Sequence, residues 1–167
     1  GPDVPFGARK SKEVPLGFSW LYQVARDAAP PAQWLADWQV PDGYRGAKAA
    51  DDLHLACHHL TACDEVALAY GDPPQNKPGN PRNLRYLLAR RTGPAGLAST
   101  FVSLLEPYRT EPLIASVQRL DTGPDAEGFD SVAARVQLAD GATDYLVSCT
   151  GGELVEGPDG LSFDCRL

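Results

Sequence analysis

Hydrophobic and polar positions alternate along the second half of the chain. Residues 99–108 (STFVSLLEPY) and 112–120 (PLIASVQRL) follow this pattern and are rich in residues that favour strands. The RTEP segment between them has the length of a hairpin connection. The pattern therefore predicts two antiparallel strands joined by a short turn.

A second hairpin is predicted around the Asp140-Gly141 dipeptide. Residues 131–140 and 143–150 carry the strand pattern on either side, and glycine readily adopts the positive backbone angle that such a turn requires. Shorter strand patterns follow at 153–157 and 161–167, separated by a Pro-Asp-Gly turn. This regular spacing is typical of a β-sandwich or a β-barrel.

The first half of the chain also contains short strand patterns, each bounded by Pro, Gly or Asp. They cover residues 18–24, 33–40, 51–60, 65–71 and 84–91. A short helix is the alternative for residues 32–38 and 84–91, because the leucines of the latter also satisfy helical spacing. We predict an all-β fold, an antiparallel β-sandwich of about ten strands with little helix.

Residues 33–40 show the alternation most clearly. Trp34, Ala36 and Trp38 fall on one face of a strand, whereas Leu35 and Asp37 fall on the other. Tryptophans in strands are more often part of the core than exposed. We therefore expect the Trp34 and Trp38 face to be buried, with sugar stacking on an exposed tryptophan as the alternative.

The length of 167 residues is typical of one domain, which we expect over residues 3–167. The initial Gly-Pro and the lack of Met suggest a tag remnant at residues 1–2 and a natural N-terminus further upstream. The last residues, LSFDCRL, have the pattern of a strand that is cut in mid-course. These features predict a domain taken from a longer protein.

The composition excludes some partners. The 15 basic and 22 acidic residues give a net charge of -7, and the field of such a molecule repels nucleic acid and anionic membranes. No apolar run approaches the roughly 20 residues of a membrane-spanning helix, and no segment resembles a signal peptide. We expect neither nucleic acid nor membrane as a partner.

The four cysteines, Cys57, Cys63, Cys149 and Cys165, lack the close spacing of a zinc ribbon or a redox motif. Unpaired cysteine is among the most buried residue types, so we expect buried free thiols in strands. A Cys57–Cys63 bridge across a turn is the alternative.

The sequence contains no common local signature of catalysis, such as a phosphate loop, a nucleophile elbow or a His-Glu-x-x-His motif. His54 and His58 would lie roughly 13 Å apart along a strand, too far to bind one ion directly. We expect histidines on a polar face rather than a metal site, and carboxylates at 51–52 and 64–65 that are solvated beside turns. We assign no catalytic residue, metal or cofactor.

The stretch from 72 to 91 gathers a third of the positive charge. Its cations are Lys77, Arg82, Arg85, Arg90 and Arg91. In a strand, Arg85 and Arg91 would face one way and Tyr86 and Arg90 the other. One interpretation is pairing with acids of neighbouring strands, for which Asp51, Asp52, Glu106 and Glu111 are candidates. The other is a local anion site, since arginine binds carboxylates and sulfates in a bidentate manner.

Residues 97–120, preceded by LRYLLARR, resemble the C-terminal part of the heparinase II/III-like polysaccharide lyases. Those proteins have an arginine-containing strand, a Ser-x-Phe-Val-x-Leu-x-Glu-Pro-Tyr strand and a Pro-x-Ile return strand in this order. The matching residues, with one residue of difference in spacing, are Ser99, Phe101, Val102, Leu105, Glu106, Pro107, Tyr108, Pro112 and Ile114. The likeness is clearest over residues 82–120 and weaker elsewhere.

The resemblance implies a β-sandwich that packs against an α/α toroid, and in the family these two domains together supply the catalytic residues. None of the family's catalytic or metal-ligand motifs can be matched to positions in this sequence, so we expect a non-catalytic domain. The resemblance also implies acidic polysaccharide as a ligand and a bacterial parent protein that is periplasmic or secreted and cleaves by β-elimination. We expect the domain to support the toroid and to line the polysaccharide groove. The alternatives are a carbohydrate-binding module and a purely structural interaction domain. The candidate sugar-binding residues are Arg85, Tyr86, Arg90, Arg91, Trp34 and Trp38.

Overall fold

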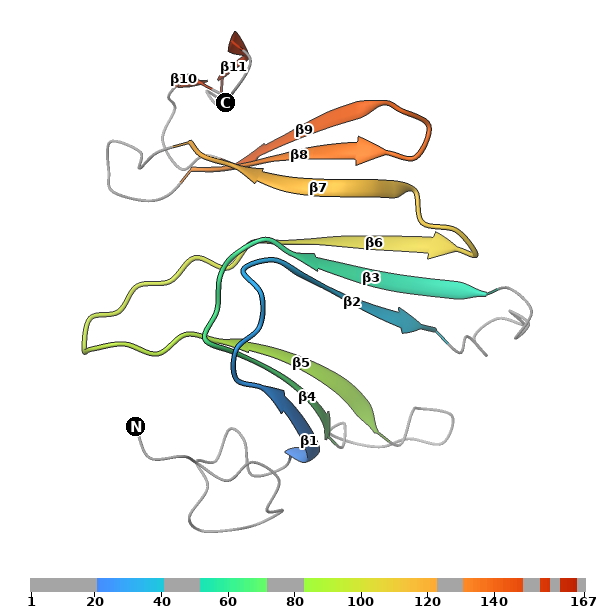
Figure 1. The fold of residues 1–167 in the computed structure, drawn as a ribbon, viewed down its shortest axis with the longest axis vertical. Helices are drawn as coiled ribbons and strands as arrows, with labels where there is room; N and C mark the ends of the chain where they lie inside the picture. Colours follow the sequence, from blue (N-terminus) through green and yellow to red (C-terminus); the bar gives the residue numbers. More distant parts are fainter. Residues whose placement is uncertain are drawn as a thin grey trace. The chain divides into compact units, whose positions relative to one another are not determined.

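The fold is all-β. A computed structural model describes residues 21–40, 52–71, 83–122, 131–148, 154–156 and 160–164, and every strand pairing within them is antiparallel (Figure 1). The strands are β1 (Leu21–Asp27), β2 (Trp34–Gln39), β3 (Leu53–His59), β4 (Glu65–Gly71), β5 (Leu84–Arg90), β6 (Ser103–Arg109), β7 (Ile114–Leu120), β8 (Val132–Leu138), β9 (Thr143–Ser148), β10 (Leu154–Glu156) and β11 (Ser162–Asp164). The described residues contain no α-helix, so the strand alternative holds for 34–39 and 84–90. The prediction of about ten antiparallel strands of the sandwich class is confirmed.

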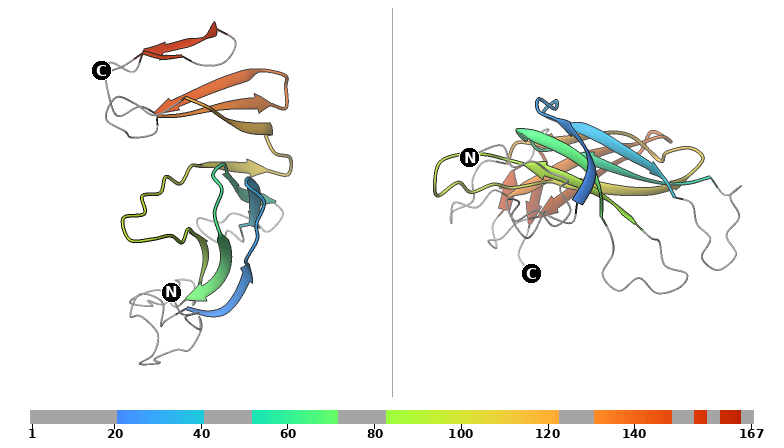
Figure 2. Two further views of the ribbon diagram at one scale, coloured as in Figure 1. Left: turned by 60° about the vertical axis from the view of Figure 1, so that its left-hand side comes forward. Right: turned by 90° about the horizontal axis from the view of Figure 1, so that it is seen from below.

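The first of two compact units contains one three-stranded sheet, in the order β1-β4-β5. Strand β4 is central, and its buried positions alternate with half-buried ones. The register of β1 shifts between Tyr22 and Ala25, where Gln23 has a positive φ of 49°. This β-bulge adds a residue, so Tyr22 and Ala25 lie on the same face of the sheet. Figure 2 shows β1 and β4 curving together.

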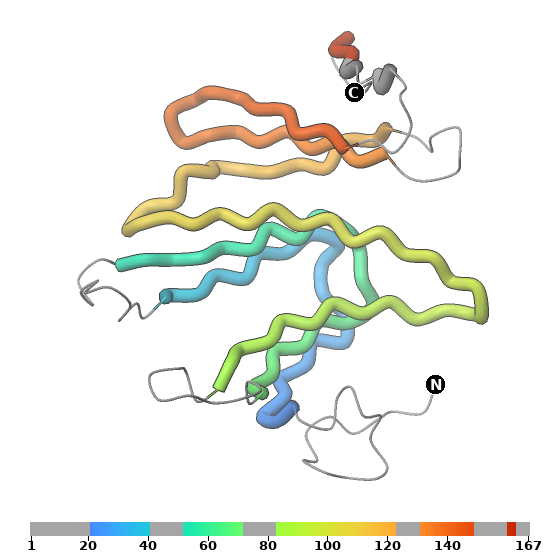
Figure 3. Tube along the Cα trace, turned by 180° about the vertical axis from the view of Figure 1, so that it is seen from behind, coloured from blue at the N-terminus to red at the C-terminus, as the bar shows by residue number. Residues whose placement is uncertain are grey.

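The second unit contains the sheets β2-β3-β6 and β7-β8-β9 and the short pair β10-β11. Strand β2 forms one edge of its sheet and pairs with β3 from Trp34↔His59 to Gln39↔His54. The trace in Figure 3 shows β2 running alongside β3, and the β8–β9 hairpin beside β7. The prediction of a single domain over 3–167 stays a prediction.

The predicted hairpin between residues 99–108 and 112–120 was wrong. Strand β6 begins only at Ser103 and pairs with β3, whereas β7 pairs with β8. An isolated bridge joins Arg109 and Glu111. Two local features oppose a β6–β7 ladder: Pro107 has no N–H to donate, and the side chain of Glu106 accepts N–H groups at the start of β7.

The core is built largely from small residues at the centres of the sheets. They include Ala56 on β3, Ala67 and Ala69 on β4, and Ala133 and Ala134 on β8. Central strands have neighbours on both edges, so the side chains at their centres are the most enclosed. Two charged residues of these sheets, Glu65 and Glu106, are also buried.

Two of the four cysteines lie in the described part of the chain. Cys57 and Cys63 are both free and buried, as expected, and there is no bridge between them. Cys57 lies on β3, but Cys63 precedes β4 and is not in a strand. Burial raises the pKa of the Cys57 thiol, an effect that a hydrogen bond with Ser103 partly offsets. The predictions for Cys149 and Cys165 fall outside the described residues.

The hairpin around Asp140-Gly141 is confirmed. Strands β8 and β9 pair up to Gln137↔Thr143, and the N–H of Leu138 donates to the carbonyl of Ala142 at 2.8 Å. The Asp140 carboxylate accepts the N–H of Ala142 at 2.9 Å. Gly141 has a φ of 93°, in the region that favours glycine.

Replacing Gly141 with Ala should destabilise the protein by about 1–2 kcal/mol, because an L-residue is strained at this φ even though the space around it is open. Chemical denaturation measures the loss. Gly141→Asn is the control and should lose less, since asparagine tolerates the left-handed region better. Equal losses for Ala and Asn would show that the backbone angle is not the cause.

Candidate functional site

The predicted arginine strand is β5, an edge strand of the β1-β4-β5 sheet. Arg85 pairs with Tyr70 and Arg90 pairs with Glu65, so the two arginines point to opposite faces as expected. Tyr70 in turn pairs with Tyr22 across β4 and β1. Tyr22, Tyr70 and Arg85 therefore form one row across all three strands, which we call the Tyr-Tyr-Arg row.

Arg85 stacks on its neighbour in the Tyr-Tyr-Arg row. Its guanidinium carbon lies 4.3 Å from the centre of the Tyr70 ring, and the rings of Tyr70 and Tyr22 are stacked with centres 6.1 Å apart. Arg85 is exposed, and no carboxylate among the described residues is bonded to it. Because the N–H donors lie in the plane of the guanidinium, stacking orients them while leaving them open to an anion.

Arg90 has a structural partner. It forms an ion pair with Glu65, whose carboxylate also binds Arg26 of β1. The hydrogen bond from Arg26 is the main reason that the pKa of Glu65 is lowered, and the charge of Arg90 adds to it despite the opposing effect of burial. The interpretation that neighbouring acids pair with the arginines thus holds for Arg90.

The acids named as candidates for this pairing were wrong where they lie in the described residues, because no ion pair joins Asp52, Glu106 or Glu111 to the arginines of 85–91. Asp52 binds Gln39 and His54, and Glu106 binds His58. Asp51 lies outside the described residues. The expectation that Glu65 is a solvated turn residue was also wrong, because it begins β4 and its side chain is only 7% exposed.

Tyr86 and Arg91 differ from Arg85 in their surroundings. Tyr86 is half-buried and pairs with Ala69, and both side chains lie on the face of the sheet opposite to Arg85. Arg91 is exposed and follows the end of β5. The adjacent Asp64 carboxylate accepts the backbone N–H and the hydroxyl of Thr92, which lower its pKa, and the charges of Arg91 and Arg90 lower it further.

The two candidate tryptophans are half-buried on edge strand β2, and the face alternation predicted for this strand is confirmed. The Trp34 ring stacks on His59 with centres 4.4 Å apart, so one of its faces is already covered. His59 is buried, and its Nδ1 lies 2.8 Å from the Ser103 hydroxyl. Burial lowers the pKa of His59. The expectation of a polar-face histidine was therefore wrong for His59.

His54 and His58 lie on the other face of β3 and bind separate carboxylates. His54 Nδ1 is 3.0 Å from Asp37 and Nε2 is 3.3 Å from Asp52, whereas His58 Nε2 is 2.9 Å from Glu106. No group of three or more His, Cys, Asp or Glu side chains within the described segments is arranged to hold a metal ion.

Tyr108 completes this polar face. Its hydroxyl donates to Asp37 at 2.9 Å, and its ring stacks on His54 with centres 4.9 Å apart. Partial desolvation and the bond to Asp37 raise the pKa of Tyr108 to about 12. At neutral pH the hydroxyl therefore keeps its proton and is a poor general base.

Glu106 is the most enclosed acid of this face. Its Oε1 accepts the backbone N–H groups of Leu113 and Ile114 at 2.6 and 2.8 Å, and its Oε2 binds His58. These bonds join β6 both to β3 and to the start of β7. In the sequence, Glu106 was noted only as a possible partner of the arginines and as part of the family resemblance, and not as an anchor between strands.

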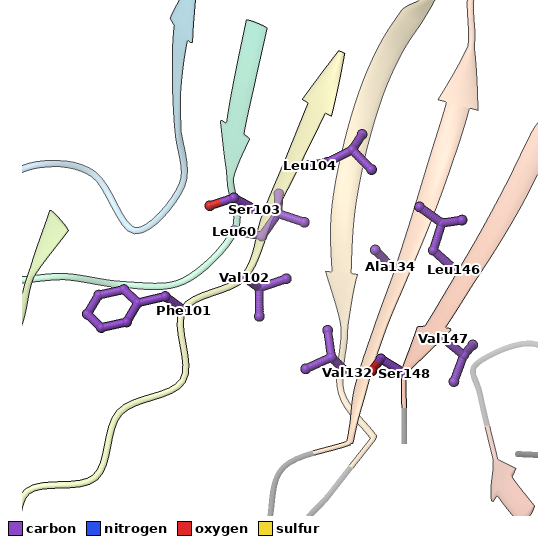
Figure 4. Close-up of a pocket in the computed structure, with 10 residues that line it drawn as sticks. All are labelled: Leu60, Phe101, Val102, Ser103, Leu104, Val132, Ala134, Leu146, Val147 and Ser148. Atoms are coloured by element: carbon purple, nitrogen blue, oxygen red, sulfur yellow. The ribbon is translucent and has the colours of Figure 1, made fainter. Parts of the chain in front are cut away.

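Two apolar hollows lie among the described residues of the second unit. The smaller, of about 340 Å³, is shown in Figure 4, where Val102 and Leu104 point toward the strands that carry Val132, Ala134 and Leu146, and Phe101 points away. The larger, of about 670 Å³, is lined by Val40, Leu53, His54, Leu55, Pro107, Tyr108, Arg109, Glu111 and Leu113.

The tyrosines of the Tyr-Tyr-Arg row were missed from the sequence. Tyr70 lies in a recognised strand pattern, but the side chains that it meets depend on register. The position of Tyr22 further depends on the bulge at Gln23. Only the aromatic enrichment of residues 18–24 and 65–71 could have drawn attention to them.

The comparisons provide no relative from which a function can be transferred. No protein-family profile, curated protein or solved structure matches the chain. In the described part of the chain, no helix has the length and apolar character needed to cross a membrane. A function can therefore be inferred only from the residues of the chain itself.

Replacing Glu106 with Ala should destabilise the protein by at least about 3 kcal/mol, because two backbone N–H groups and His58 lose their acceptor inside the protein. Glu106→Gln keeps one oxygen for the N–H groups and should lose only about 1–2 kcal/mol. Urea unfolding distinguishes them. Similar losses for both variants would show that the carboxylate is not the anchor.

Replacing Arg26 and Arg90 together with Ala should destabilise the protein by about 3–5 kcal/mol at neutral pH, because Glu65 then remains buried and unpaired. Because the pKa of Glu65 is lower in the folded state than in the unfolded state, its carboxylate stabilises the fold at any pH above the unfolded-state pKa. This contribution disappears as the pH falls through the folded-state pKa. The deficit should therefore shrink in acid, as urea unfolding at neutral and acidic pH will measure.

The matched control for this pair is Arg85→Ala with Arg91→Ala, which removes the same charge from residues that are not bonded to Glu65. It should lose no more than about 1 kcal/mol. Equal losses for the two double variants at neutral pH would contradict the assignment of Arg90 to Glu65.

Proposed function

We propose that the chain is a non-catalytic β-sandwich domain of a heparinase II/III-like polysaccharide lyase, and that it binds acidic polysaccharide. The fold class and the resemblance over residues 82–120 support the family. The roles of the motif residues support a non-catalytic part, since Glu106 is fully used in bonds within the protein and Tyr108 keeps its proton.

The observation that carries the binding proposal is the geometry of Arg85. A guanidinium stacked on a tyrosine presents its donors in a fixed plane, which suits the two oxygens of a uronate carboxylate or a sulfate. An acidic chain with net charge -7 attracts such a ligand only through a local cation of this kind.

The Tyr-Tyr-Arg row also has the extent of a short oligosaccharide. Three neighbouring strands span about 10 Å, given a strand spacing of about 4.8 Å. The hydroxyl of Tyr70, whose ring the guanidinium covers, supplies a further hydrogen-bonding group for sugar oxygens. Of the candidates from the sequence, Arg85 is therefore the strongest, whereas Arg90 is used by Glu65 and Trp34 by His59.

A structural interaction domain is the second candidate, and exposed leucines favour it. Leu105 and Leu113 are 61% and 64% exposed, and Leu113 lines the larger apolar hollow together with Val40. An apolar surface of this kind would suit contact with the toroid of the parent protein.

Titration of the chain with uronate-containing, sulfated and neutral oligosaccharides tests the proposal. We expect binding of acidic oligosaccharides only, weakened by salt, and no ultraviolet absorbance of unsaturated product. Arg85→Ala should weaken binding about tenfold or more with folding stability retained, since charge-assisted hydrogen bonds are lost.

Arg91→Ala is the control for charge, because Arg91 is exposed in the same segment but lies outside the Tyr-Tyr-Arg row. It should bind almost as well as the unaltered chain. If Arg85→Ala and Arg91→Ala lost the same affinity for acidic oligosaccharides, the effect of Arg85 would be explained by net charge alone. Release of unsaturated product would refute the non-catalytic role, and a failure to bind any oligosaccharide would favour the structural interaction domain.

A further inference from the structure

His54 is positioned between two acceptors. Its two ring nitrogens contact Asp37 on β2 and Asp52 immediately before β3. The same Asp37 oxygen accepts the Tyr108 hydroxyl, and the same Asp52 oxygen accepts the Gln39 amide at 3.1 Å. The Asp37 oxygen and the Asp52 oxygen that contact His54 are thus both hydrogen-bond acceptors, since each already accepts a bond from another side chain.

A neutral imidazole cannot satisfy this arrangement. It has a single N–H, so one of its nitrogens would direct a lone pair at a carboxylate oxygen. Only the imidazolium donates from both nitrogens. The stacked ring of Tyr108, with its centre 4.9 Å away, further favours a positive charge.

Asp52 is held in an unusual backbone conformation at this point. Its φ is 44°, in the left-handed region that few residues other than glycine adopt. Its carbonyl accepts the N–H of Thr110 at 3.0 Å, and the next residue, Leu53, accepts the N–H of Val40 at 2.7 Å. The contact with His54 thus lies where β2, β3 and β6 are fastened together at one end.

We propose that His54 is a proton-dependent latch, which fastens Asp52 and the end of edge strand β2 while it is positively charged and releases them when it loses its proton. The released end borders the larger apolar hollow, which Val40 and Leu53 line. The latch therefore controls how firmly one wall of that hollow is held.

The charged surroundings agree with this role. The titratable groups that lie around His54 in the described part of the chain are Asp37, Asp52, His58, Glu106 and Tyr108, and Arg109 and Glu111 line the same hollow. Partial desolvation lowers the pKa of His54, but the hydrogen bonds and charges of Asp37 and Asp52 outweigh it, so the pKa is raised. The stabilisation that a histidine with a raised pKa provides is fully present at a pH below the unfolded-state pKa. It is lost as the pH rises through the folded-state pKa.

His58 is the matched comparison on the same strand. It contacts one carboxylate, that of Glu106, through Nε2. A neutral imidazole with its proton on Nε2 makes this contact without difficulty. The two histidines thus share a face and a type of partner but differ in their requirement for a second proton.

The test is nuclear magnetic resonance on the whole chain from about pH 5 to about pH 9, following the His54 ring and amide hydrogen exchange. We expect a His54 midpoint above about 6.5. Exchange of the Val40 and Thr110 amides, corrected for intrinsic rates, should rise through that midpoint. The exchange rate should rise about tenfold for each pH unit by which the His54 midpoint exceeds the pKa of histidine in the unfolded chain. The Leu138 amide, bonded within the β8–β9 hairpin, should not respond.

Two variants sharpen the test. His54→Gln should give rapid exchange at Val40 and Thr110 that no longer depends on pH, and His58→Gln should keep the pH response. A His54 midpoint at or below about 6.5 would overturn the latch, as would exchange that ignores the titration. If His54→Gln does not fold, the titration of the unaltered chain still decides.

Discussion

The carboxylate of Glu106 connects the β2-β3-β6 sheet to the start of β7, and no strand ladder joins these two parts of the second unit. One oxygen accepts two backbone N–H groups at the start of β7, and the other binds His58 on β3. Pro107 follows directly and has no N–H of its own to offer to a neighbouring strand. A buried acid beside a proline thus replaces the backbone ladder at this point, and the polar face of β3 and β6 is organised around it.

The same principle arranges the charges of the first unit. Glu65 is buried at the start of β4, and two arginines from the strands on either side neutralise it. This use of Arg90 leaves Arg85, on the opposite face, as the stacked and exposed guanidinium. The positive charge concentrated in residues 72–91 therefore has two roles, because successive side chains of a strand point to opposite faces. One role is internal neutralisation, and the proposed one is anion binding.

The two histidines of the polar face show how the number of acceptors determines the need for a proton. His58 meets one carboxylate and is satisfied by a single N–H, whereas His54 lies between two and requires both. Tyr108 stacks on His54 and shares Asp37 with it. In the Glu-Pro-Tyr segment of the family resemblance, Glu106 binds the start of β7, Pro107 offers no N–H for a strand ladder, and Tyr108 supports His54 of the proposed latch. All three roles are structural.

The sequence by itself determined the strands, their faces and the turn at Asp140-Gly141, because alternation and glycine conformation are local properties. It predicted correctly that Arg85 and Arg90 point apart and that Trp34 and Trp38 share the inner face of β2. Only the tertiary structure decided which strands pair, so the β6–β7 hairpin was wrongly predicted and Glu65 was taken for a solvated residue. Partners such as Tyr70 for Arg85, or Asp37 for His54, depend on register and on a β-bulge. These are set by packing between segments far apart in the chain, which local patterns do not encode.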